Sequence, residues 1–155
     1  MKTLTVISDT HGNMRKITEL NAIFEECDYI VHLGDTSSDG ARIRAQFPDK
    51  TILINGNCDP VKLGEDEKVI EIENVRIFST HGHLYSAKQT LLKLVRRAKQ
   101  LNCSAVLYGH THSAREDVVD GITLINPGTL SRYSQNSYCY IVVTDEKAVG
   151  KIVRI

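Results

Sequence analysis

An aspartate and a histidine stand two residues apart near the start of the chain, as Asp9 and His11, directly after an apolar run that ends at Ile7. A carboxylate oxygen and an imidazole nitrogen together suit a borderline transition metal better than calcium or magnesium. Gly12 lets the backbone turn tightly beside them, and Asn13 can cap a following helix. By itself the pair favours a simpler interpretation, in which Asp9 is a turn residue and His11 a loop side chain.

The same arrangement recurs along the chain, where polar residues directly follow other short apolar runs. These residues are Asp35, Asn57, His81, His110 and His112. The carboxyl ends of strands in an α/β fold converge on one edge, where ligands bind, so distant residues would meet there. Five of the six histidines belong to these clusters, and only His32 lies inside a predicted strand. Each cluster has a simpler explanation as a turn or a surface side chain, but their joint occurrence at five strand ends favours one shared site.

The apolar runs predict the elements that would bring these residues together. Strands are expected at 4–7, 29–33, 51–54 and 104–108, and in hairpins at 68–72 with 75–79, 118–119 with 122–125, and 138–143 with 149–155. Helices are expected at about 13–26 and 39–47, and a third is predicted to begin at a capping box of Ser86 and Gln89 and to reach Leu101. This layout predicts an α/β fold, a four-layer α/β/β/α sandwich of two mixed β-sheets flanked by helices.

The composition is that of an ordinary globular protein, with 41% hydrophobic residues in a chain of 155, and we expect a single domain over residues 1–155. Nineteen basic and nineteen acidic side chains cancel, so no global field attracts nucleic acid or an anionic membrane. Four scattered cysteines form no C-x-x-C pair, which argues against a structural zinc site or a disulfide framework. Asp9 interrupts the first apolar stretch, and no run reaches transmembrane length, so we expect a cytoplasmic protein without a signal peptide or a membrane partner.

Five short motifs together resemble, in the same order, the motif series of the calcineurin-like metallophosphoesterases. They are Asp9-x-His11, Gly34-Asp35, Gly56-Asn57, His81-Gly82-His83 and Gly109-His110-Thr111-His112. Two details, Gly56-Asn57-Cys58-Asp59 and Asn126-Pro127-Gly128, are more similar to the small, single-domain phosphodiesterase branch of that superfamily. The resemblance extends from Asp9 to about Gly128, which is nearly the whole chain.

The resemblance implies a centre of two divalent metal ions. Its expected ligands are, for the first ion, Asp9, His11, Asp35 and His112, and for the second, Asn57, His81 and His110, with Asp35 shared. Manganese is the expected metal, and iron, nickel, cobalt or zinc accept the same ligand types. The ions would convert a bridging water into a hydroxide that attacks phosphorus in line, while Asn57 steadies the charge on the phosphoryl oxygens.

One position departs from many larger relatives, which carry a histidine after the motif asparagine to protonate the leaving group, whereas this chain has Cys58. A general acid is typically worth about 10²–10⁴-fold in rate. His83 and Asp59 are the candidates to replace it, although His83 could equally orient a neighbouring ligand. Cys58 is not expected to be a nucleophile, because no neighbouring base is evident.

These observations favour a metal-dependent phosphodiesterase that hydrolyses a small phosphodiester. The alternative is a non-catalytic interaction module, as in the retromer-type scaffold subunit that resembles this fold, but every expected ligand is present here. A nucleic-acid-binding protein or nuclease is a third interpretation, and the chain has little room for the substrate-capping element of a nuclease. The resemblance also implies a homodimer or a larger homo-oligomer.

Overall fold

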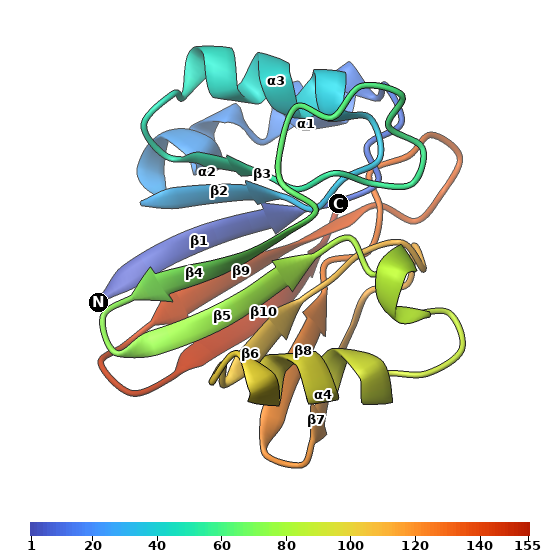
Figure 1. Ribbon diagram of the computed structural model, residues 1–155. Helices are drawn as coiled ribbons and strands as arrows, with labels where there is room; N and C mark the ends of the chain where they lie inside the picture. The colour runs from blue at the N-terminus through green and yellow to red at the C-terminus, as the bar shows by residue number, and fades with distance from the viewer.

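Two five-stranded sheets face each other in the computed structural model, which describes residues 1–155, and helices cover their outer faces (Figure 1). The first sheet has the strand order β10-β9-β1-β2-β3. Its strands are β1 (Lys2–Ile7), β2 (Tyr29–His32), β3 (Thr51–Leu53), β9 (Ser137–Val143) and β10 (Ala148–Arg154). β1, β2 and β3 pair in parallel, whereas β9 and β10 run antiparallel to their neighbours. The sheet is therefore mixed, as predicted.

The second sheet has the order β4-β5-β6-β8-β7 and is also mixed. Its strands are β4 (Glu67–Ile72), β5 (Val75–Thr80), β6 (Ala105–Leu107), β7 (Arg115–Val119) and β8 (Ile122–Asn126). β5, β6 and β8 are parallel, and the two hairpins β4–β5 and β7–β8 close the sheet on either side. The predicted Asp120-Gly121 turn joins β7 to β8, with both residues at positive φ.

Helices lie outside each sheet. α1 (Met14–Glu19), α2 (Asn21–Glu26) and α3 (Ser37–Gln46) cover the first sheet, and α4 (Leu92–Gln100) covers the second, where a 3₁₀ turn, η1 (His83–Tyr85), follows β5 (Figure 1). α4 buries Leu94, Val95 and Ala98 against Phe78 and neighbouring residues of the second sheet. The four-layer sandwich predicted from the sequence is confirmed. None of these helices has the length and apolar character that crossing a membrane requires.

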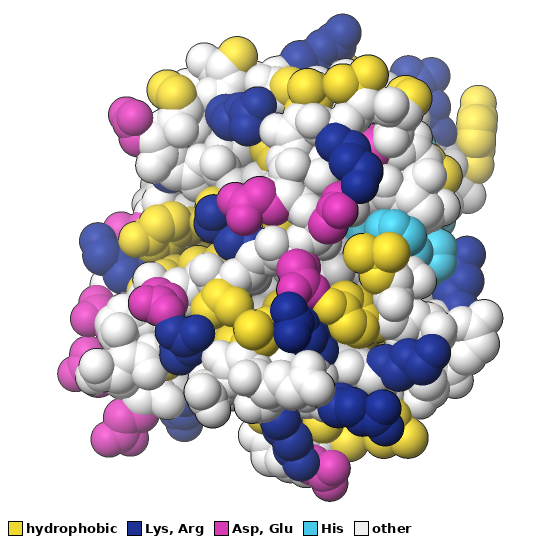
Figure 2. All heavy atoms as spheres, viewed as in Figure 1, with side chains coloured by type: hydrophobic (Ala, Val, Ile, Leu, Met, Phe, Trp, Pro, Cys, Tyr) yellow, Lys and Arg dark blue, Asp and Glu magenta, His cyan; other side chains and the backbone are white.

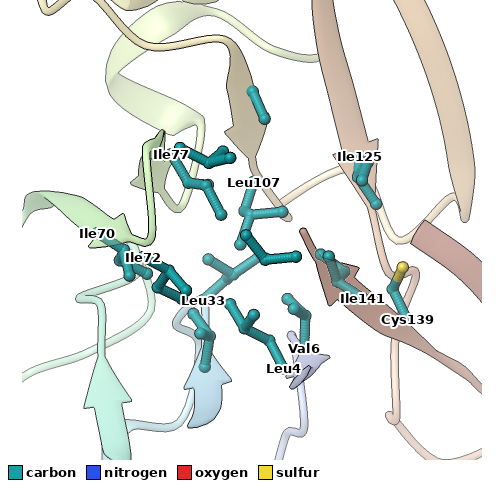
Figure 3. Close-up of a cluster of buried hydrophobic side chains, with 14 of the residues drawn as sticks. Leu4, Val6, Leu33, Ile70, Ile72, Ile77, Leu107, Ile125, Cys139 and Ile141 are labelled. Atoms are coloured by element: carbon teal, nitrogen blue, oxygen red, sulfur yellow. The ribbon is translucent and has the colours of Figure 1, made fainter. Parts of the chain in front are cut away.

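Aliphatic side chains from the facing sides of both sheets fill the space between them. Figure 3 shows Leu4, Val6 and Ile141 of the first sheet pointing toward Ile77 and Leu107 of the second. All five are fully buried. Fully burying one such side chain contributes roughly 1.5–3 kcal/mol to the free energy of unfolding. This shared core fixes the two sheets relative to each other, and therefore also fixes the loops at their ends.

The predicted helix at 13–26 is in fact two helices, α1 and α2, which meet at Leu20. The Leu20 amide donates to the carbonyl of Ile17 in a tight last turn of α1. Asn13 precedes α1 but does not cap it through its side chain. Its side-chain amide instead donates to the carbonyl of Leu130, at 2.7 Å. A contact across the fold has replaced the local cap.

The predicted start of the third helix at Ser86 is wrong, since α4 begins at Leu92. Ser86 has a φ of 54°, in the left-handed region, whereas a capping residue needs extended backbone. The Leu92 amide donates to the hydroxyl of Thr90, at 3.1 Å, which satisfies one free amide of the first turn. The helix predicted at 39–47 begins two residues earlier, with α3 starting at Ser37.

Candidate metal centre

Loops at the carboxyl ends of parallel strands carry the predicted ligands. Asp9 and Asp35 follow β1 and β2 of the first sheet, and His81 and His110 follow β5 and β6 of the second. The Asp9 amide donates to the carbonyl of Gly34, at 2.9 Å, which ties the first two loops together. Histidine side chains reach the surface where the two layers meet (Figure 2). Both sheets therefore deliver polar loops to one common edge.

Four residues of the predicted first site lie together: Asp9, His11, Asp35 and His112 offer ligand atoms that are all within 4.8 Å of one another. His112 Nε2 is 3.0 Å from Asp9 Oδ1, and His11 Nε2 is 3.8 Å from Asp35 Oδ2. The Asp9 side chain is fully buried, whereas the side chains of His11 and His112 are 32% and 41% exposed. The cluster is thus buried on its carboxylate side and open to solvent on its histidine side.

The two oxygens of Asp9 have different surroundings. Oδ2 accepts hydrogen bonds from the Ser8 hydroxyl at 2.5 Å and from the His110 amide at 3.0 Å. Oδ1 is buried without a hydrogen-bond partner. A buried carboxylate oxygen without a partner costs free energy, and a bound cation would remove that cost. Carboxylates beside imidazoles are also a donor set that transition metals accept, so these residues fit a divalent metal.

His81 extends the cluster toward the residues predicted for the second ion. Its Nε2 lies 3.4 Å from Asp35 Oδ2 and 3.0 Å from Asn57 Oδ1. Its Nδ1 lies 2.7 Å from the carbonyl of Leu33, which can only accept, so Nδ1 carries a proton and Nε2 faces the site. The His110 ring centroid is 5.1 Å from that of His81. Asp35 Oδ2 therefore lies between two groups of nitrogen donors, as a shared ligand would.

The charges of the cluster shift the pKa values of its members. Burial alone would lower the pKa of His81, but the carboxylates of Asp35 and Asp9 outweigh it and raise that pKa. The Asp9 carboxylate, whose Oδ1 is 3.0 Å from His112 Nε2, raises the pKa of His112. Burial would raise the pKa of Asp35, but His81 and the Cys58 amide hold it well below its usual range. Without metal, the carboxylates thus favour the protonated forms of His81 and His112.

Five of the predicted ligands adopt a backbone conformation that L-residues rarely use. Positive φ occurs at eleven non-glycine residues, and five of these are predicted ligands, namely Asp9, His11, Asp35, His110 and His112. Such conformations cost on the order of 1–3 kcal/mol each and gather at functional sites. The sequence motifs give no direct sign of this strain. The fold maintains it through the hydrogen bonds that hold the loops.

The model of the calcineurin-like phosphoesterase superfamily domain matches residues 1–148. The chain belongs to this superfamily. The probable metallophosphoesterase YsnB of Bacillus subtilis is 33% identical over 126 residues, which cover 81% of this chain and 73% of that protein. A phosphodiesterase of Methanocaldococcus jannaschii is 29% identical over 147 residues, covering 83% of this chain and 84% of that protein.

Solved structures share the fold of this calcineurin-like phosphoesterase. A predicted phosphoesterase of Streptococcus pneumoniae superposes with a TM-score of 0.83 at 24% identity, covering 99% of this chain and 89% of that one. Vps29 of Entamoeba histolytica, solved in complex with Zn²⁺, gives a TM-score of 0.77 at 19% identity, with coverage of 99% and 98%. At these identities the likeness shows the fold alone. Membership of the superfamily, with its divalent metals, agrees with the Asp and His cluster.

Two glycines of this calcineurin-like phosphoesterase allow the loops to approach the carboxylates. A Cβ at Gly56 would lie 2.1 Å from Asp35 Oδ1, and one at Gly109 would lie 2.0 Å from Ser8 Oγ and 2.8 Å from Asp9 Oδ2. Any side chain there would push the loop or the carboxylate away. The glycines of two motifs are therefore required by the packing of the site itself.

Asp59, one of the predicted catalytic residues, lies behind the loops. Its Oδ1 accepts the amide of Ser37 at 2.6 Å, and its Oδ2 accepts the amides of Gly56 at 2.7 Å and Asp35 at 3.2 Å. Both oxygens are thus engaged with backbone. Cys58 beside it is exposed, and its amide donates to Asp35 Oδ1 at 2.9 Å. Partial desolvation of its sulfur and the Asp35 carboxylate raise the pKa of the Cys58 thiol.

Sequence reasoning missed a buried polar network under the loop of residues 9–12. The Thr10 hydroxyl and the Gly12 amide both donate to Asp39 Oδ2, at 2.7 and 2.8 Å. His32 Nε2 lies 3.0 Å from the Thr10 hydroxyl, and its Nδ1 accepts the Gly34 amide at 3.2 Å. Burial lowers the pKa of His32, so it remains neutral. The one histidine outside the motifs therefore supports the loops of both aspartate ligands.

Proposed function

We propose that this chain is a metal-dependent phosphodiesterase. The observation that carries the proposal is Asp9 Oδ1, a buried carboxylate oxygen without a hydrogen-bond partner that lies 3.0 Å from His112 Nε2. Membership of the superfamily and the phosphodiesterase of Methanocaldococcus jannaschii among its relatives support this reaction class. The substrate is a small phosphodiester.

Two divalent ions, with manganese as the first choice, fit the donors on either side of Asp35. Asp9, His11, Asp35 and His112 would hold one ion, and Asn57, His81 and His110 would hold the other, with Asp35 shared. Bound there, divalent ions supply an activated water near neutral pH and offset charge on the phosphoryl oxygens. Asp9 and Asp35 would hold the cations, while the fixed loops orient the ligand side chains before substrate arrives.

The remaining predicted residues serve different roles. Asn57 directs Oδ1 toward His81, so its Nδ2 can donate to a phosphoryl oxygen of the substrate. His83 has a buried Nδ1 without a partner, and its ring is 5.4 Å from that of His81. We assign proton transfer to the leaving oxygen to His83. We assign Asp59 to positioning the loops, because three backbone amides occupy its oxygens.

A non-catalytic interaction module on the same fold is the second candidate. Its support is the fold shared with Vps29 at a TM-score of 0.77. The presence of all seven ligand-type residues favours the enzyme. The Cys58 thiol does not offer a competing covalent route, because partial desolvation and the Asp35 carboxylate raise its pKa and so disfavour the thiolate.

The deciding experiment strips the protein with a chelator, refills it with Mn²⁺ and measures hydrolysis of bis-p-nitrophenyl phosphate and p-nitrophenyl phosphate. We expect activity that returns only with metal and is greater on the diester. Asp35→Asn should lose bound metal, measured by mass spectrometry, together with turnover. Asp49→Asn, at an exposed position remote from the ligands, is the matched control. Folded protein that hydrolyses neither ester with manganese, nickel, cobalt or zinc would favour the interaction module.

A further inference from the structure

A cavity of about 460 Å³ adjoins the metal centre on the side of Cys58. Two chain segments form it, and each begins directly after a proposed ligand. The first is the loop residue Thr36 and the first turn of α3 with Ser38, which follow Asp35, and the second is the loop with Cys58, Pro60, Val61 and Leu63, which follow Asn57. The Cys58 amide donates to Asp35 Oδ1, so this wall is bonded to the shared carboxylate.

The walls of this cavity are held in place by hydrogen bonds of the protein itself. The Ser37 amide donates to Asp59 Oδ1 at 2.6 Å, and the Ser37 hydroxyl donates to the carbonyl of Val61 at 2.9 Å. Arg44 Nη1 donates to the carbonyl of Leu63 at 3.2 Å. α3 thus braces the second segment. The cavity is built before any ligand enters it.

The groups left free to a ligand are mostly apolar. Val61 is 61% exposed and Leu63 is 36% exposed, beside Pro60, and no lysine or arginine lines the cavity. The only carboxylate, Asp59, is engaged by three backbone amides. Thr36 and Ser38 add two hydroxyls. By contrast, another cavity, of about 450 Å³, is lined by Arg15, Lys16 and Arg132 and suits an anion.

We propose that the cavity beside Cys58 binds one ester substituent of the substrate, and that this substituent is an uncharged aliphatic or aromatic group. The assignment rests on the proposed phosphodiesterase function. A phosphodiester whose phosphorus lies at the metal centre directs its two substituents to different sides, and one of these sides is that of Cys58, which lines the cavity and whose amide donates to Asp35 Oδ1. Burying apolar atoms of the substituent against Val61 and Leu63 would add binding free energy, whereas a charged substituent would find no counter-ion there.

The test compares wild-type protein with the double variant Val61→Ser/Leu63→Ser. Val118→Ser, at an exposed position on β7 that does not line the cavity, is the matched control. For bis-p-nitrophenyl phosphate and Mn²⁺-loaded protein, we expect KM to rise by about fivefold or more in the double variant with kcat unchanged, because apolar contact is lost. The control should keep the wild-type KM. Turnover with an unchanged KM in the double variant would overturn the cavity assignment and leave the phosphodiesterase standing.

A second measurement does not depend on turnover. Benzyl alcohol, an uncharged aromatic probe, is titrated into ¹⁵N-labelled protein, and the amide shifts are followed. We expect shifts at Thr36, Ser38 and Val61 that are lost in the double variant. Shifts confined to these segments, in protein that hydrolyses no ester, would support the cavity while the proposed function failed. Shifts elsewhere, or none at high probe concentration, would overturn the cavity assignment.

Discussion

One oxygen of the Asp9 carboxylate, Oδ2, accepts hydrogen bonds from the protein, whereas the other, Oδ1, accepts none. Replacing Asp9 with asparagine keeps an oxygen to accept from Ser8 and the His110 amide, and removes a buried charge whose Oδ1 has no hydrogen-bond partner. In chelator, at a pH where the histidines are neutral, we expect Asp9→Asn to raise the free energy of unfolding by about 1 kcal/mol. Added Mn²⁺ should make the wild type the more stable of the two proteins, because the ion stabilises only the wild type.

Urea unfolding with and without Mn²⁺ measures both effects, with Asp49→Asn as the control for removing one exposed negative charge. A lower stability of Asp9→Asn in chelator would mean that the carboxylate already has a cationic partner, and the argument from the orphaned oxygen would fail.

Metal binding should depend on pH through His81 and His112. Nearby carboxylates raise the pKa of both, so the metal-free protein keeps these protons to a higher pH than free histidine does. A metal requires the neutral imidazole and must displace the protons. The apparent affinity for Mn²⁺ should therefore rise with pH, by up to about tenfold per pH unit for each proton released, and level off above the raised pKa values.

The same histidine–aspartate pairs stabilise the metal-free fold below the pKa of the unfolded chain, and that contribution disappears as the pH rises through the raised values. Calorimetric titration in buffers of different ionisation enthalpy counts the protons released. An affinity that is constant between about pH 6 and pH 8 would contradict these pKa directions.

Two glycines between elements, Gly56 and Gly121, differ in what an added Cβ would contact. A Cβ at Gly56 would lie 2.1 Å from Asp35 Oδ1, so Gly56→Ala should displace the shared carboxylate and weaken Mn²⁺ binding by about tenfold or more. Gly121, in the β7–β8 turn, has open space around its Cβ position but a φ of 77°. Gly121→Ala should cost about 1–2 kcal/mol of stability and leave the metal affinity unchanged. Equal effects of the two variants on metal affinity would contradict this explanation.

The strands are the elements that the sequence predicts best. Short apolar runs that end in glycine, asparagine or aspartate predict β1, β2, β3 and β6, because burial on both faces leaves an almost continuous apolar pattern. The helix starts are less predictable. Asn13 and Ser86 both carry capping side chains, but Asn13 bonds the distant Leu130 carbonyl and Ser86 takes a left-handed turn. Local patterns do not contain these long-range contacts.

Much of the candidate site is predictable for the same reason that the strands are. Its ligand-type residues follow strand ends, so the topology brings them together. What the motifs do not reveal is the support beneath them: His32, Thr10 and Asp39 form a buried network, and Asp59 bonds three amides. In the buried network, Thr10 is separated from His32 by 22 residues and from Asp39 by 29 residues along the chain. Only the folded arrangement identifies them as parts of the site.

For the whole molecule, the division of the proposed ligands between two sheets matters most. Asp9 and Asp35 come from the first sheet, whereas His81, His110 and His112 come from the second. Metal at about 100 times its Kd should stabilise the fold by about 2.7 kcal/mol. Hydrogen exchange should then slow at the Cys58 and His110 amides, which donate to Asp35 and Asp9 from opposite sheets. Slowing at only one of the two amides would contradict a site shared by both sheets.

The core shown in Figure 3 contains side chains of both sheets, so it links the two parts of the molecule that carry the proposed ligands. Leu107 belongs to this core and is not one of the predicted ligands, yet it helps to set the separation of the sheets that carry them. Binding and packing are then thermodynamically linked, and such linkage acts equally in both directions. The affinity for a metal ion at this edge would therefore depend on the spacing between the two sheets. A substitution deep in the core, far from the loops, would then change the metal affinity of the site.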